Sequence, residues 1–134
     1  MGEWDMLEKV KAGALAVGVL IACTSAGLAQ PQTKLTSELD KQLSQAIWCS
    51  SLLFEHSYVY EESSEDALRY EDMAFEIGAE IDTVLLEEHG MRQAEVDEIW
   101  AVYDDGAYLL AQDDPESFSD QLAACEAGFE TLMP

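Results

Sequence analysis

The chain has 134 residues, of which 49% are hydrophobic and 25% are charged, and its formal net charge is -22 at pH 7. This length holds one small domain with enough apolar residues for a core, so disorder by composition is not expected. The negative charge repels phosphate backbones and anionic lipid headgroups, which argues against nucleic-acid binding and electrostatic docking on a membrane. A partner steered by charge is expected to be basic, although acidity also keeps proteins soluble in salty surroundings.

The N-terminal segment has the layout of an export signal. Lys9 and Lys11 precede an apolar run and a short polar stretch, which ends with small residues before Gln30. We therefore expect residues 1–29 to be an export signal that is removed. The apolar run is rich in Ala and Gly, whereas a retained membrane span needs about 20 strongly apolar residues. Met6 is an alternative start, because the sequence after it is the more conventional signal.

The same segment offers a second interpretation. Its sequence LIAC, which ends at Cys23, resembles the lipobox of bacterial lipoproteins. In that case the signal is residues 1–22, and Cys23 is lipidated and holds the protein at a membrane. We expect no other attachment to a membrane. Residues 30–35 are predicted to be a linker or tether. Both interpretations place the protein in the bacterial periplasm or outside the cell, or anchored by lipid to the envelope membrane.

The first helix is expected from about Thr36 to Tyr60. Thr36 and Ser37 are favourable capping residues. Small or apolar side chains then recur at helical spacing and predict a buried face, namely Leu39, Leu43, Ala46, Ser50, Leu53 and Ser57. The neighbouring stripe of the same helix carries Cys49.

The second helix is expected from a cap at Ser63 or Ser64 to His89. Gly90 follows it and is predicted to end the helix in the left-handed conformation. The residues predicted to face inward are Leu68, Met73, Ala74, Ile77, Ile81, Val84 and Leu85.

The third helix is expected from about Arg92 to Gln112. Gly106 lies near its middle, and we predict a bend there because glycine weakens a helix by about 1 kcal/mol relative to alanine. The predicted core residues are Val96, Ile99, Trp100, Tyr103, Ala107 and Leu110.

The fourth helix is expected to begin at Pro115, with Asp114 as its cap. Its apolar residues form one stripe at spacings of three and four, namely Phe118, Leu122, Cys125, Phe129 and Leu132. Cys125 is therefore predicted to face the core.

These elements predict an all-α fold, a small up-down-up-down four-helix bundle over residues 36–134, because short connections make successive helices antiparallel. At about 1.5 Å per residue, Cys49 and Cys125 come to the same height in such a bundle. They are also the two cysteines left once Cys23 is removed or lipidated, an even number suited to an oxidising compartment. We predict a disulfide between Cys49 and Cys125, worth about 4 kcal/mol in the chain-entropy treatment.

The sequence offers no catalytic constellation. A di-iron bundle needs Glu three residues before His, but Leu53 and Leu86 stand at that spacing before His56 and His89. The sequence also lacks a calcium loop, a zinc motif and a Gly-rich phosphate loop. We therefore expect a protein that is not an enzyme and uses no cofactor, with no catalytic, metal-binding or cofactor-binding residues.

Three aromatic residues, Trp48, Tyr58 and Trp100, lie partly outside the main apolar stripes. They are candidates for a recognition patch on the surface. The simpler alternative is that they widen a small core.

Two functions fit these observations. The first is an exported interaction protein that engages another protein, either a basic protein or a subunit of an envelope complex. The second is a stress-protective holdase that acid would open by discharging carboxylates. For the second, the chain is loosely similar to small helical periplasmic acid-stress chaperones, which are also short and exported, with a cysteine pair and a Trp near the first Cys, as in Trp48-Cys49. The cysteine spacing and the charge differ from theirs.

Overall fold

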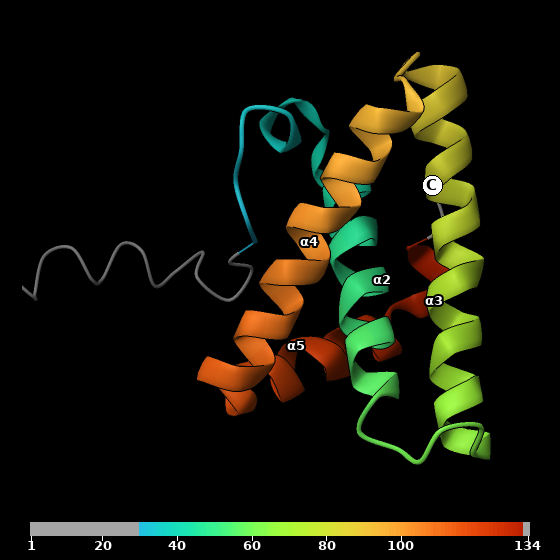
Figure 1. Ribbon diagram of the computed structural model, residues 1–134, viewed down its shortest axis with the longest axis vertical. Coiled ribbons are helices and arrows are strands. Elements are labelled where there is room, and N and C mark those ends of the chain that lie inside the picture. Colours follow the sequence, from blue (N-terminus) through green and yellow to red (C-terminus); the bar gives the residue numbers. More distant parts are fainter. Residues whose placement is uncertain (1–29, 133–134) are drawn as a thin grey trace, which may run out of the picture.

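The computed structural model describes residues 30–132 (Figure 1). Both proposed signals, Cys23 and the last two residues of the chain lie outside the described residues. Within them, the helices are α2 (Lys41–Ser57), α3 (Glu65–Thr83), α4 (Gln93–Asp113) and α5 (Pro115–Ala127), with the short elements η1 (Thr36–Glu38), η2 (Val84–Glu88) and η3 (Phe129–Thr131). This part of the chain contains no strand, so the predicted all-α helical bundle is confirmed.

The first long helix begins later than the sequence suggested. Leu39 has an extended backbone, with ψ of 146°, so the chain breaks between η1 and α2. The carboxylate of Asp40 then accepts a hydrogen bond from the Leu43 amide at 2.8 Å. Asp40 therefore caps α2, because it satisfies an amide that the first turn leaves free. The helix also ends at Ser57 and not at Tyr60.

α2 is the central helix of the bundle. Figure 1 shows it between α4 and α3, and its extensive packing against both agrees with this view. α5 crosses the lower part of α2 and also packs against α4. α3 and α4, by contrast, make few contacts with each other. Three helices thus surround α2, which explains why most of its residues are buried.

The central position of α2 buries three serine hydroxyls, and each has a partner. Ser50 donates to the Ala74 carbonyl of α3 at 2.9 Å, and Ser51 donates to the Asp104 carboxylate of α4 at 2.7 Å. Ser57 donates to a carbonyl within its own helix at 2.6 Å. These bonds remove the cost of burying hydroxyl groups and connect α2 to both flanking helices.

The predicted disulfide is present and joins α2 to α5. The Cα atoms of Cys49 and Cys125 lie 5.5 Å apart, so the two cysteines do come to the same height. One residue before Cys49, the Trp48 indole donates to the Gln121 side chain of α5 at 2.8 Å. α5 is therefore held on one face of α2 by a covalent bond and a hydrogen bond.

Most of α3 agrees with the prediction. The Ser64 hydroxyl caps it by accepting from the Ala67 amide at 3.2 Å, and Gly90 has the left-handed φ of 64° that ends this segment. Two details differ. The last turn widens into the π-helix η2, and Leu68, predicted to face inward, is 47% exposed. Leu68 points outward because α3 packs on α2 through the adjacent stripe that starts at Ala67, while α4 does not cover the other side of α3.

Gly106 has a different role from the predicted bend. α4 is one uninterrupted α-helix through this position. A Cβ atom on Gly106 would lie 2.6 Å from Pro31 Cγ and 3.3 Å from a ring carbon of Trp48. The glycine therefore allows the segment before η1 to lie closely against α4.

α4 and α5 otherwise follow the prediction closely. α4 starts one residue after Arg92, and α5 starts at Pro115 with Asp114 accepting from the Ser117 amide at 3.1 Å. The apolar stripe of α5 is interrupted, because the helix ends at Ala127 and η3 follows. Leu132 is buried nevertheless.

Loss of the disulfide should destabilise the protein considerably. The cysteines are 76 residues apart, and opening a loop of this length is expected to lower the free energy of unfolding by about 4 kcal/mol. Urea unfolding of the oxidised and reduced protein measures the difference. The double variant Cys49→Ala/Cys125→Ala is the control and should not respond to the reductant. Equal stability of the oxidised and reduced protein would refute the prediction.

Two glycine substitutions should have different effects. A Cβ atom on Gly78 of α3 meets only ordinary contacts, at 3.8 Å from Ser50 Oγ and 3.9 Å from Trp100. Gly78→Ala should therefore raise the free energy of unfolding by up to about 1 kcal/mol. Gly106→Ala should not show this gain, because its Cβ must displace Pro31. Urea unfolding compares them, and a more stable Gly106→Ala variant would contradict this account.

Candidate binding groove

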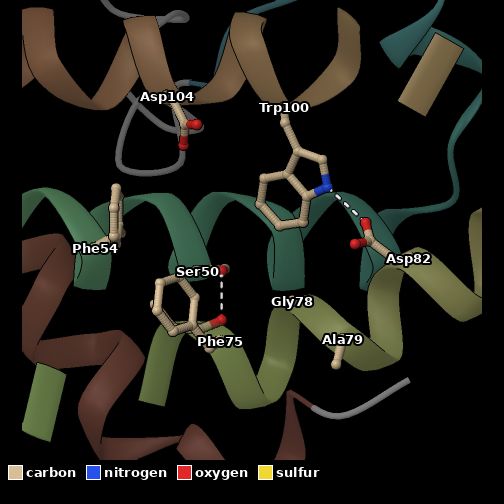
Figure 2. Close-up of a pocket in the computed structure, with 9 residues that line it drawn as sticks. Ser50, Phe54, Phe75, Gly78, Ala79, Asp82, Trp100 and Asp104 are labelled. Carbon is tan, nitrogen blue, oxygen red and sulfur yellow. Dashed lines mark hydrogen bonds between the residues drawn. The ribbon is translucent and has the colours of Figure 1, made fainter. Parts of the chain in front are cut away.

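One face of α2 lies open between α3 and α4. Trp48 and Cys49 of α2 point toward α5, and at about 100° per residue Ser50 and Phe54 lie on the opposite side of the helix. These two residues form the floor of a groove of about 340 Å³, with α3 and α4 as its walls (Figure 2). The groove exists because α3 and α4 both pack on α2 and hardly touch each other.

Aromatic side chains line this groove from all three helices. Phe54 of α2 and Phe75 of α3 lie with their ring centroids 5.6 Å apart, and Trp100 of α4 is half-buried. Tyr58 extends the row at the end of α2, since its ring packs edge-on against Phe54 at 5.2 Å. Phe75 is 58% exposed, so a large apolar side chain in the groove is left partly uncovered by the protein itself.

Two carboxylates flank the Trp100 ring. Figure 2 shows Asp82 of α3 on one side of it and Asp104 of α4 on the other. The Trp100 indole donates to Asp82 Oδ1 at 2.7 Å, and this hydrogen bond bridges the two walls. Asp104 accepts from Ser51 at 2.7 Å. No Lys, Arg or His is among the residues that line the groove.

The groove concentrates negative charge in partly desolvated surroundings. Burial raises the pKa of the Asp104 carboxyl, and the neighbouring Asp105 raises it further, while the hydrogen bond from Ser51 opposes the shift. Burial and the nearby Asp104 raise the pKa of Glu55, which follows Phe54 on α2. Burial is the larger cause of both shifts, and an acidic neighbour adds to each of them.

Apolar positions continue beyond the groove on both walls. Leu68 lies seven residues before Phe75 on α3, and Tyr108 lies one turn after Asp104 on α4, so each shares a face with a lining residue. Leu68 is 47% and Tyr108 is 52% exposed. The apolar surface at the groove is therefore larger than the hollow itself.

Of the three aromatic residues considered for a surface patch, one widens the core and two lie at the surface. Trp48 is buried between α2 and α5, where it widens the core. Trp100 and Tyr58 do lie at the surface, the first in the groove and the second at its end. The sequence did not lead us to expect Phe54 and Phe75 at the surface. One signal could have indicated Phe75, because it falls beside the buried stripe of α3, where a charged residue is usual.

The predicted cysteines Cys49 and Cys125 form a structural bridge away from the groove. In the part of the chain that the structure describes, no group of three or more His, Cys, Asp or Glu side chains is placed to hold a metal ion. Between residues 30 and 132, no helix is both long enough and apolar enough to cross a membrane.

Comparisons of the chain with protein-family models, with curated proteins and with solved structures found no match.

Replacing Asp104 by Asn should stabilise the protein at neutral pH. The folded-state pKa of Asp104 is raised above its ordinary 3.8, so the folded state binds this proton more tightly than the unfolded state does. Stability from this group is therefore present at acid pH and is lost as the pH rises through the folded-state pKa. The gain in Asp104→Asn should stay below about 1 kcal/mol, since solvent screens this partly exposed residue.

Urea unfolding at pH 7 and at about pH 3 measures this effect, which should vanish at the lower pH because the carboxyl is then protonated. The asparagine retains an oxygen that accepts from Ser51. A variant that is less stable than the parent at pH 7 would contradict the assigned direction of the pKa shift.

Proposed function

We propose that this protein is an exported, non-enzymatic interaction protein that binds a basic partner protein. The observation that carries the proposal is that few of the negative side chains are paired with a positive side chain of the same protein. The net charge of the chain is -22, and within residues 30–132 one ion pair forms, between Arg92 and Glu95 at 3.5 Å. Such a surface attracts and steers a positively charged partner.

The scaffold suits recognition by a preformed surface. The disulfide and the hydrogen bonds of Ser50, Ser51 and Trp48 fix three helices around α2. A rigid receptor loses little conformational entropy on binding, so more of the contact energy appears as affinity. The disulfide also supports an oxidising location, as does the signal-like sequence before Gln30.

The alternative, an acid-stress holdase, requires acid to loosen the bundle, and it has weaker support. Protonation of Asp104 and Glu55 favours the folded state, because their pKa values are raised. Protonation of His56 disfavours the folded state, because burial lowers its pKa, although the nearby Glu126 carboxylate partly offsets this shift. Protonation of Glu95 also disfavours the folded state, because the hydrogen bond from the Arg92 amide lowers its pKa, but this carboxylate is partly exposed and little stability depends on it.

The proposal is tested by identifying and measuring the partner. The exported protein, tagged at its C-terminus and expressed with its own signal, is crosslinked in cells and captured from the envelope fraction. The purified partner is then titrated at about 50 and 300 mM salt. We expect a protein with an isoelectric point above about 9 and a Kd at least roughly tenfold weaker at the higher salt, because screening removes the attraction.

A neutral or acidic partner, or a Kd that salt does not change, would refute the proposal. A protein without a partner at neutral pH that suppresses client aggregation below about pH 4 would favour the holdase alternative.

A further inference from the structure

The α3 wall of the groove contains space that the chain itself does not require. Gly78 lies in the middle of α3, where glycine costs about 1 kcal/mol of helix stability relative to alanine. No neighbour demands it, since a Cβ atom there would keep 3.8 Å from Ser50 Oγ and 3.9 Å from Trp100. Gly78 lines the open groove, so the position that a side chain would fill is free for a ligand group.

The aromatic rings around Gly78 suit a flat cation. Trp100 stands on one side and Phe54 and Phe75 on the other, and aromatic faces attract cations through their ring quadrupoles. An apolar stem of three or four carbons fits against the same rings. The exposure of Phe75 is removed when such a side chain lies on it.

The two carboxylates of the groove favour a positively charged ligand group. Asp82 and Asp104 lie on either side of Trp100, and the residues that line the groove include no base. An anion would be repelled, and a neutral apolar group would desolvate both carboxylates without pairing them. A guanidinium donates several hydrogen bonds in one plane and stacks on indole, whereas an ammonium is a compact and strongly hydrated charge.

We infer that the groove between α3 and α4 over Phe54 is the receptor for one arginine side chain of the basic partner. The guanidinium lies against Trp100 and pairs with Asp82 and Asp104, and its stem passes over Gly78. This inference rests on the proposed function and names the point at which the partner is recognised.

A small probe tests the groove without any partner. The oxidised protein is titrated with N-acetylarginine amide and followed by two-dimensional ¹H–¹⁵N NMR. The Gly78 amide and the Trp100 indole N–H should shift, while the Trp48 indole N–H, which bonds Gln121 on the α5 side, should not. The neutral isostere N-acetylcitrulline amide should bind at least roughly tenfold more weakly, because it lacks the charge that the carboxylates pair.

Four variants separate the groove from the overall charge. Gly78→Ala places a methyl group on the α3 wall, and Asp104→Asn removes a carboxylate. Each should weaken binding of the arginine probe at least roughly fivefold with the fold intact. Gly128→Ala, whose Cβ would meet ordinary contacts at 3.5 Å and beyond, and Asp113→Asn at the end of α4 are matched controls and should leave the Kd unchanged.

The same variants distinguish the two proposals. A basic partner whose salt-sensitive binding is unaffected by Gly78→Ala and Asp104→Asn would overturn the groove assignment and leave the proposed function in place. Failure to find a basic partner would refute the proposed function, while the probe titration still reports on the groove. Equal affinity for the arginine and citrulline probes, or tighter binding of N-acetyllysine amide, would overturn the arginine assignment.

Discussion

The bond between Cys49 and Cys125 holds α5 across one face of α2 and thereby determines which face of the central helix stays open. α3 and α4 pack on the remaining sides of α2 and make few contacts with each other besides the hydrogen bond from Trp100 to Asp82. The result is a groove whose floor and walls belong to three helices that are connected by buried hydrogen bonds. The disulfide is thus a structural bond whose position also shapes the binding surface.

The groove keeps features that cost the free protein stability. Gly78 weakens α3, Phe75 remains exposed, and the carboxyl groups of Asp104 and Glu55 have pKa values raised by burial and by an acidic neighbour of each. A cation with an apolar stem in the groove would cover Phe75 and compensate the charge of Asp104. Functional sites commonly retain such local conflicts. Elsewhere in the described part of the bundle, the Tyr103 hydroxyl is the one buried side-chain polar group without a hydrogen-bond partner.

Local sequence signals predicted the helices well because their physical causes are local. The caps at Ser64 and Asp114 and the left-handed Gly90 depend on neighbours within a few residues, and the disulfide followed from helix lengths, the antiparallel arrangement and the cysteine count. One failure was also local, since Asp40 and not Thr36 or Ser37 caps the first long helix. The others were tertiary: Leu68 turned outward, and Gly106 made room for a proline that is 75 residues earlier in the chain. Periodicity identifies the apolar face of a helix but not which helix is central, so the groove and the role of Phe75 were not predictable.

The proposed binding mode places a guanidinium between Trp100 and Phe75. It can be tested by intermolecular nuclear Overhauser effects between an isotopically labelled arginine ligand and the unlabelled protein. We expect contacts from the arginine side-chain methylene protons to the Trp100 and Phe75 rings and to the Gly78 α-protons. Contacts confined to other acidic surfaces of the bundle, with none to the Trp100 ring, would contradict it.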